Sequence, residues 1–79
     1  MEFWTSMITV VLTGMLTHYV GGRARLEREA GASVAETLRA LGIPTELVAM
    51  ALVDNRQVPK DTRPPDGSTL TLLPLIGGG

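Results

Sequence analysis

The middle of the chain carries a complete set of signals for one short helix. Ser33 and Glu36 have the S-x-x-E spacing of a capping box, and Gly42 followed by Pro44 marks the helix end. The apolar residues between these signals recur on one helix face, and they are Val34, Leu38 and Leu41. A helix of about two to three turns is not stable alone, so its apolar face needs a covering layer. This requirement constrains the fold of everything around it.

Five short segments around this helix have the character of β-strands. They are rich in β-branched or alternating apolar residues, and they span residues 7–13, 23–29, 47–53, 56–59 and 68–76. We expect Ala24 and Leu26 to point inward, and we interpret residues 47–53 as a buried strand. Asp54-Asn55 predicts a hairpin turn, because both residues tolerate the left-handed conformation. Residues 15–22 are expected to hold one helical turn before two glycines.

The predicted order is two strands, one helix and three strands (ββαβββ) in a chain of 79 residues. A helix that crosses over between a hairpin and later strands in so short a chain implies a single sheet. We therefore predict an α+β fold, with a mixed sheet of four to five strands and one main helix packed on one face. The domain is expected to span residues 7–76, with residues 1–6 as a disordered extension and residues 77–79 as a flexible glycine tail.

Charge and composition argue against several classes of function. The formal net charge of −1, the few aromatic residues and the lack of a basic stripe argue against nucleic acid as a partner. The longest apolar stretch, Leu47 to Val53, is far shorter than the roughly 20 residues that span a bilayer. The absence of cysteine removes disulfides, thiol catalysis and cysteine–zinc sites. Because no signal-peptide pattern opens the chain, we expect a cytoplasmic protein.

The chain ends in three consecutive glycines, Gly77, Gly78 and Gly79. Average glycine usage is only about 7%, so chance composition is a disfavoured explanation of this run, although chain ends are compositionally biased. Without side chains, Gly77 and Gly78 can thread a narrow channel, and no Cβ blocks attack at the carboxyl carbon of Gly79. A free carboxylate is a poor electrophile, and this chain has no groups that could activate it. A partner must therefore supply the activation, and adenylation by ATP is the obvious route.

Other residues add little chemistry. Leu73, Leu75 and Ile76 precede the tail and form either the edge of the core or an exposed partner-binding patch. His18 is the only histidine, and we interpret it as a surface or satisfied residue rather than a catalytic one. Three arginines of one predicted strand are interpreted as a solvated face, with contact to a partner as the alternative: Arg23, Arg25 and Arg28. The carboxylates show no acid–base pair or metal-ligand spacing, so we predict a protein that is not an enzyme and binds no cofactor or metal.

Four local matches together resemble the ThiS/MoaD family of ubiquitin-like sulfur carrier proteins. "ITVVLTGMLTHYVGG" resembles the first strand and the segment after it, and "SVAETLRALGIP" resembles the family's helix. "ALVDNRQVPKDT" resembles a strand, turn and returning strand, and "DGSTLTLLPLIGGG" resembles the last strand and the diglycine tail. The resemblance covers Met7 to Gly79 and implies the β-grasp (ubiquitin-like) fold.

The resemblance also implies a function. An E1-like adenylyltransferase, using ATP and Mg²⁺, would form the acyl-adenylate of Gly79. A sulfur donor such as a cysteine desulfurase or a rhodanese-type protein would convert it to a thiocarboxylate. A sulfur-accepting synthase would then take the sulfur. The chain would be a substrate of enzymes, would bind no nucleic acid or membrane, and would be a monomer when free.

Two other functions remain open at this point. In the first, the chain is a ubiquitin-like modifier whose Gly79 forms an isopeptide bond with lysine, which requires the same adenylate. In the second, it is a β-grasp binding module, such as an RNA-binding or regulatory domain, and the tail is incidental. The sulfur acceptor (thiamine thiazole, molybdopterin or tRNA uridine) is also open, because the middle of the chain resembles ThiS and the segment after the first strand resembles MoaD.

Overall fold

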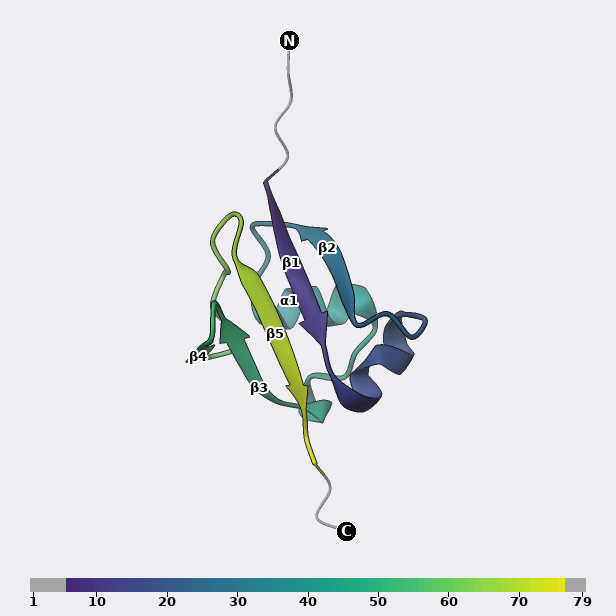
Figure 1. The fold of residues 1–79 in the computed structure, drawn as a ribbon. Coiled ribbons are helices and arrows are strands. Elements are labelled where there is room, and N and C mark those ends of the chain that lie inside the picture. The colour runs from purple at the N-terminus through teal and green to yellow at the C-terminus, as the bar shows by residue number, and fades with distance from the viewer. Residues whose placement is uncertain (1–5, 77–79) are drawn as a thin grey trace.

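The computed structural model describes residues 6–76, which form five strands, one α-helix and two 3₁₀ helices (Figure 1). In chain order the elements are β1 (Met7–Leu12), η1 (Gly14–Val20), β2 (Arg25–Glu29), α1 (Val34–Leu41), η2 (Thr45–Leu47), β3 (Val48–Val53), β4 (Arg56–Val58) and β5 (Thr69–Pro74). The predicted order of two strands, one main helix and three strands is confirmed. The expected terminal segments fall on residues 1–5 and 77–79, outside the described residues, except for Ser6.

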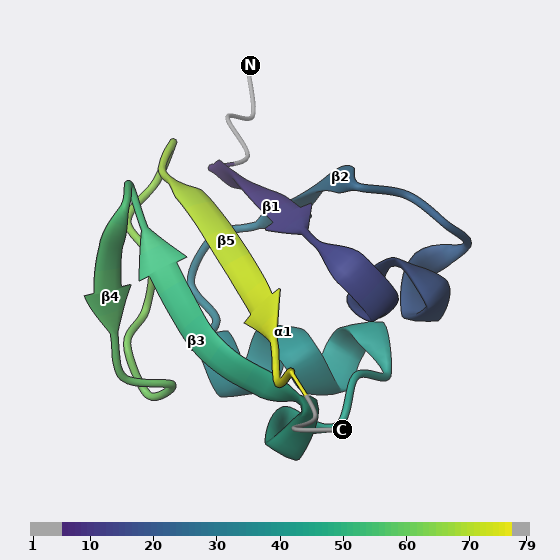
Figure 2. The same ribbon diagram turned by 60° about the horizontal axis from the view of Figure 1, so that its bottom comes forward.

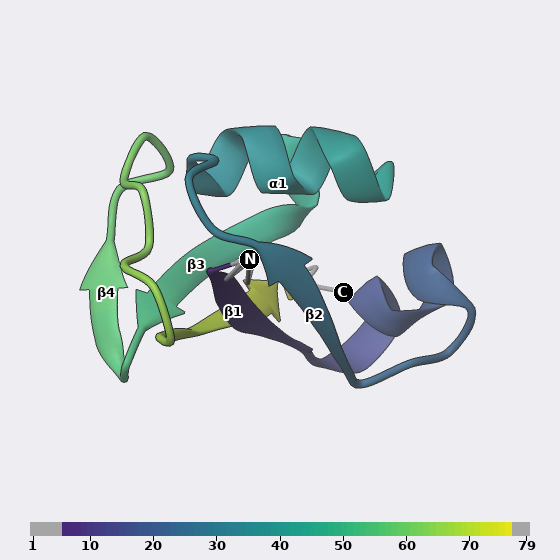
Figure 3. The same cartoon turned by 90° about the horizontal axis from the view of Figure 1, so that it is seen from above.

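The last strand in the sequence is the central strand of the sheet. The strand order is β2-β1-β5-β3-β4, with β1 and β5 parallel and the other neighbours antiparallel. Figures 1 and 2 show β5 lying between β1 and β3. α1 packs across one face of the sheet, and none of the described elements covers the other face (Figure 3). The predicted mixed sheet with one main helix on one face is therefore confirmed.

The boundaries of α1 follow from local chemistry. The Glu36 N–H donates to Ser33 Oγ over 3.1 Å, and the Ser33 N–H donates to Glu36 Oε1 over 2.9 Å. This is the predicted capping box, and it satisfies backbone donors that a helix start leaves free. Gly42 ends the helix in the left-handed conformation at φ 75°, as predicted. The helix therefore presents a fixed apolar face to the sheet.

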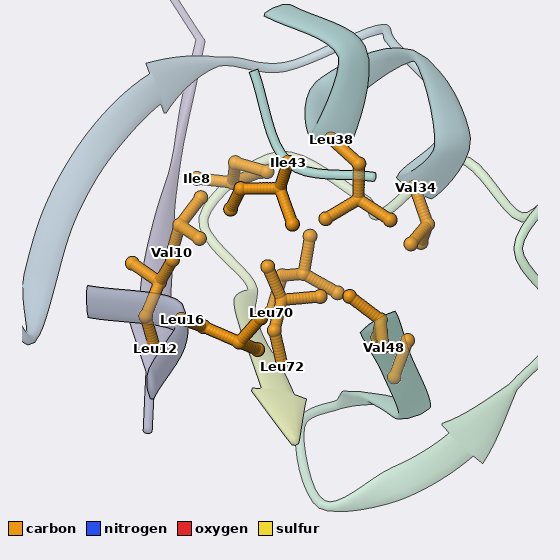
Figure 4. Close-up of a cluster of buried hydrophobic side chains, with 11 residues drawn as sticks. Ile8, Val10, Leu12, Leu16, Val34, Leu38, Ile43, Val48, Leu70 and Leu72 are labelled. Carbon is orange, nitrogen blue, oxygen red and sulfur yellow. The ribbon is translucent and has the colours of Figure 1, made fainter. Parts of the chain in front are cut away.

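The core lies between α1 and the covered face of the sheet (Figure 4). Every second residue of β1 and β5 points into it, as the alternation of these strands predicts. The buried hydrophobic residues are Ile8, Val10, Leu12, Leu16, Val34, Leu38, Ile43, Val48, Ala51, Leu70 and Leu72. Because β5 contributes Leu70 and Leu72, both 0% exposed, the strand that leads into the tail is anchored at the centre of the core.

Three expectations need correction. Ala24 does not point inward: it is exposed, because it lies before the first residue of β2 rather than within the strand. Residues 47–53 do not form a strand buried on both faces, since α1 covers only one face and Ala49 is exposed. The expected single turn after β1 is the longer 3₁₀ helix η1, which starts at Gly14 and buries Leu16 completely.

Candidate functional site

The chain leaves the sheet at the carboxyl end of β5, and both neighbours of that strand hold it there. On one side, the Thr13 hydroxyl donates to the Leu72 carbonyl oxygen over 3.2 Å. On the other side, the Leu75 N–H donates to the Leu47 carbonyl oxygen over 2.7 Å. The backbone is therefore fixed up to Leu75, one residue past the end of β5 and four residues before Gly79.

Two 3₁₀ helices flank this exit. η2 ends at Leu47, whose carbonyl oxygen accepts the bond from Leu75, and η1 begins at Gly14 beside Pro74. Gly14 lies close to the Pro74 ring: a Cβ built on this glycine would be 3.1 Å from Pro74 Cγ. Gly14 also has a φ of 58°, which L side chains rarely adopt. Sequence reasoning treated this glycine only as the end of a strand and missed its contact with the exit.

The three apolar residues predicted before the tail differ in their exposure. Ile76 is 86% exposed and Leu75 is 58% exposed, so neither belongs to the core. Leu73 is half-buried and lies on the face of the sheet that α1 does not cover, paired with Met50 of β3. The structure thus places all three outside the core, while Gly77, Gly78 and Gly79 lie outside the described residues. The assignment of a partner-binding role to these residues remains a prediction.

The uncovered face of the sheet extends the apolar surface of the exit. We call this the open face and define its apolar part by four half-buried residues: Val11, Met50, Leu52 and Leu73. The register places Thr71 of β5 between Val11 and Leu52, and Leu73 beside Met50 in the next row. Three of these four residues were missed by sequence reasoning. No alternation of polar and apolar residues along 48–53 marks Met50 and Leu52, because both faces of that strand carry apolar residues.

The described residues contain no group of three or more histidine, cysteine, aspartate or glutamate side chains that could hold a metal ion. Glu36 is the carboxyl whose pKa departs clearly from its ordinary value. The pKa is lowered, first by the hydrogen bond from the Ser33 backbone and then by the charge of Arg63. Arg63 Nη1 lies 3.1 Å from Glu36 Oε1 and 2.6 Å from the Gly31 carbonyl oxygen, so this cluster ties a loop to the start of α1. Its role is structural.

Two polar groups bond to the backbone at the exit, and they are the Thr13 hydroxyl and the Leu47 carbonyl oxygen. Neither is a general base, a nucleophile of lowered pKa or a cation that could stabilise a developing charge. Across residues 6–76, no helix is long and apolar enough to cross a membrane.

Comparison with known proteins assigns a family and supports the fold. The model of the ThiS family matches residues 10–79. No curated protein matches the chain. The solution structure of the Haloferax volcanii HVO 2177 protein is similar, with a TM-score of 0.72 and 17% identity over 95% of this chain and 88% of that chain. The crystal structure of SAMP1 from Haloferax volcanii is also similar, with a TM-score of 0.61 and 22% identity over 92% and 99% of the two chains. The predicted β-grasp, ubiquitin-like fold is confirmed.

Proposed function

This chain belongs to the ThiS family of ubiquitin-like carriers and modifiers, and on that premise we propose that it is a sulfur carrier. In this proposal the carboxylate of Gly79 is adenylated by an E1-like enzyme and converted to a thiocarboxylate. The thiocarboxylate then donates its sulfur in the synthesis of a cofactor (thiamine thiazole or molybdopterin) or in tRNA thiolation. Small carriers of this kind are substrates of enzymes and not enzymes themselves.

The observation that carries the proposal is the way in which the chain leaves the sheet. Within residues 6–76, Leu75 is the last residue held by a backbone hydrogen bond to the domain, and Ile76 after it is 86% exposed. Gly79 follows Leu75 by four residues, so an extended backbone carries its carboxyl carbon up to about 14 Å from Leu75. This reach lets the carboxylate enter the active site of a partner while the domain stays outside.

Two steps would make the thiocarboxylate. A carboxylate oxygen of Gly79 attacks the α-phosphorus of ATP, pyrophosphate leaves, and an acyl-adenylate forms; Mg²⁺ held by the partner would neutralise the phosphates. A hydrosulfide equivalent then attacks the acyl carbon, and AMP leaves with the acyl oxygen as the C–O bond breaks. A glycine at this position leaves the acyl carbon open to attack on both sides. ATP and Mg²⁺ belong to the activating partner and not to this chain.

We assign two surfaces to partners: the open face of the sheet and the apolar residues at the carboxyl end of β5. Leu73, Leu75 and Ile76 would guide the tail into an E1-like adenylyltransferase, and Gly77 and Gly78 would thread its channel. A few residues near the centre of an interface usually carry most of its affinity, and the contacts around them exclude water. A sulfur donor, such as a cysteine desulfurase or a rhodanese-type protein, and a sulfur-accepting synthase would meet the same end of the molecule. A supply of ATP for the first step supports a cytoplasmic location.

The test is reconstitution with an E1-like enzyme from the same host, ATP, Mg²⁺ and a sulfide source. We expect intact-mass spectrometry to show one oxygen replaced by sulfur, and fragmentation to locate the change on Gly79. Deletion of Gly79 should abolish the change, because the acyl carbon would no longer reach the attacking groups. The activity of the enzyme is checked first by its adenylation of its cognate carrier. If that active enzyme leaves this chain as the unmodified acid, the proposal is overturned.

The docking part of the proposal has its own test. Ile76→Asp introduces a charge at an 86% exposed position, so it should leave the melting temperature unchanged and weaken binding to the activating enzyme. Ala40→Asp, at an exposed position of α1, is the matched control and should bind as the wild type does. A modifier function would give a different product, because the Gly79 carbonyl would appear in an amide bond to a lysine of another protein.

A further inference from the structure

The charges along the edge strand β2 match those of the same strand running in the opposite direction. Residues 23–29 read Arg-Ala-Arg-Leu-Glu-Arg-Glu, with arginines before Leu26 and glutamates after it at matching distances. β2 pairs with β1 on one side only, and its other edge is free of any strand in the described part of the chain. Of its five residues only Leu26 is half-buried, and the others are exposed. The strand is therefore available to a partner of matching pattern.

The hydrogen bonds to β1 show which backbone groups remain at the free edge. Leu12 N–H donates to the Ala24 carbonyl oxygen over 2.9 Å, and Ala30 N–H donates to the Ser6 carbonyl oxygen over 2.8 Å. Bonded pairs recur at every second residue of an antiparallel ladder, so Leu26 also bonds toward β1. The N–H and C=O groups of Arg25, Glu27 and Glu29 consequently face outward.

The side chains of these same residues share one face. Val11 is opposite Arg25, Thr9 opposite Glu27 and Met7 opposite Glu29, so all three project on the open face and not toward α1. Among the residues that the structure describes, none of the three charges forms an ion pair within the chain. Both the backbone groups and the charges at this edge thus have unused bonding capacity.

We infer that β2 pairs with β2 of a second copy of this chain, antiparallel, about a two-fold axis at Leu26. In this register Arg25 is opposite Glu27 of the second copy. The two-fold symmetry also places Glu27 opposite Arg25 of the second copy, so the ion pair occurs twice. These are also the positions whose backbone groups face outward, so each pair can exchange two backbone hydrogen bonds. Ala24 is opposite Arg28 of the second copy, and its small side chain leaves room for the arginine. The sequence led us to expect a monomer, and this pairing departs from that expectation.

The neighbouring symmetric register is disfavoured by charge. An axis at Glu27 would place two Glu27 carboxylates directly opposite each other, and like charges at that position destabilise a strand pair. The axis at Leu26 instead places two leucines opposite each other. Leu26 lies with Val20 and Leu41 along a groove between β2 and α1 that Arg23, Glu27 and Arg28 also line, so this contact covers the apolar part of a mixed surface. Charge and apolar contact therefore select the same register.

The contact is small, because it involves one short strand from each copy. Stable protein interfaces bury roughly 1,200 Å² or more in total, so we expect a reversible dimer in the upper micromolar to millimolar range. The test is sedimentation equilibrium of the full chain across that range, with amide chemical shifts recorded in parallel. Dimerisation should weaken as salt rises, and the shifts that move should belong to residues 25–29. A wild-type chain that stays monomeric up to millimolar concentration would overturn the inference.

Charge-swap variants test the register. Arg25→Glu and Glu27→Arg each replace two attractive pairs by two repulsive ones, so each should raise the dissociation constant by about ten-fold or more. The double variant Arg25→Glu with Glu27→Arg restores every pair about Leu26 and should return to the wild-type constant. With an axis at Glu27, the double variant would instead bring like charges together. Failure of the double variant to recover would refute the proposed register.

Arg28→Glu is the matched control for these variants. It makes the same change of charge on the same strand, but its position is opposite Ala24 of the second copy and carries no ion pair. We expect it to change the dissociation constant less than three-fold, against ten-fold or more for Arg25→Glu. Equal losses from the two variants would show that only net charge matters, and would overturn the inference. Thermal melting of each variant verifies that the exposed substitutions leave the domain folded.

Discussion

Replacing Gly14 with alanine tests how η1 packs against the exit of β5. Gly14 has a φ of +58°, and a Cβ built there would lie 3.1 Å from Pro74 Cγ. Gly21 is the matched control, because its φ is +69° and a Cβ built there meets nothing within 4 Å. The two alanine variants therefore share the penalty of a left-handed backbone and differ in the contact with Pro74.

The expected losses follow from these two geometries. An alanine in the left-handed region costs roughly 1–2 kcal/mol of folding free energy. In a domain of this size 1 kcal/mol lowers the melting temperature by about 4–8 °C, so Gly21→Ala should lower it by about 4–16 °C. In Gly14→Ala the new methyl group also presses on the Pro74 ring, which is fixed to the backbone and cannot rotate away. Overpacking costs about 1–3 kcal/mol, so Gly14→Ala should lose at least ~1 kcal/mol more than Gly21→Ala.

Thermal and urea unfolding, followed by circular dichroism, measure both variants. The assay is repeated in a Pro74→Ala background, where the Cγ atom is absent. There we expect Gly14→Ala to cost no more than Gly21→Ala, because only the shared backbone penalty remains. Equal losses for the two variants in the wild-type background would refute the reasoning, since the contact between η1 and the exit would then carry no energy.

Variants in the helix cap, the core and the hairpin turn test the rest of the fold. The Ser33 backbone and Arg63 lower the pKa of Glu36, so its carboxylate stabilises the fold above the unfolded pKa and loses this contribution as pH falls. Melting temperatures of wild type and Glu36→Gln should therefore converge as pH falls through the lowered pKa of Glu36. Leu38 is 0% exposed, so Leu38→Ala should lose about 2–5 kcal/mol in urea unfolding and Leu38→Met less than ~1.5 kcal/mol. Asn55 has a φ of 71°, so Asn55→Val should lose about 1–2 kcal/mol in the same assay, whereas Asn55→Gly should lose nothing.

Features of the fold that depend on neighbours in the sequence were predictable. The capping box of Ser33 and Glu36 closes within four residues, and the Gly42 cap depends on one residue's backbone freedom. The hairpin at Asp54 and Asn55 follows in the same way, with both residues at positive φ. Alternation then predicted which residues of β1 and β5 face the core. Each of these signals depends on interactions between residues that are close together in the sequence, so it can be recognised from a single sequence.

Features that depend on distant contacts were not predictable from the pattern. The exposure of Met50 and Leu52 depends on α1 covering one face of the sheet, which an apolar run does not reveal. The irregular register between Val48 and Met50 also appears only once β3 pairs with β5. The contact of Gly14 with Pro74 joins residues far apart in the sequence. For the candidate site, the sequence therefore proposed the tail and its apolar neighbours, which remain a prediction, while the surfaces around them required the structure.

The position of β5 suits the proposed function, in which so small a domain would present Gly79 to another protein. A tail attached to an edge strand could be pulled away together with that strand, because only one ladder of hydrogen bonds would hold it. β5 instead pairs with β1 on one side and β3 on the other, and it buries Leu70 and Leu72 completely. A force on the tail is therefore borne by two ladders and by the core. Under the proposed function, the domain would therefore stay folded while a partner engages the residues beyond Leu75, and its fixed surfaces would be available at the same time.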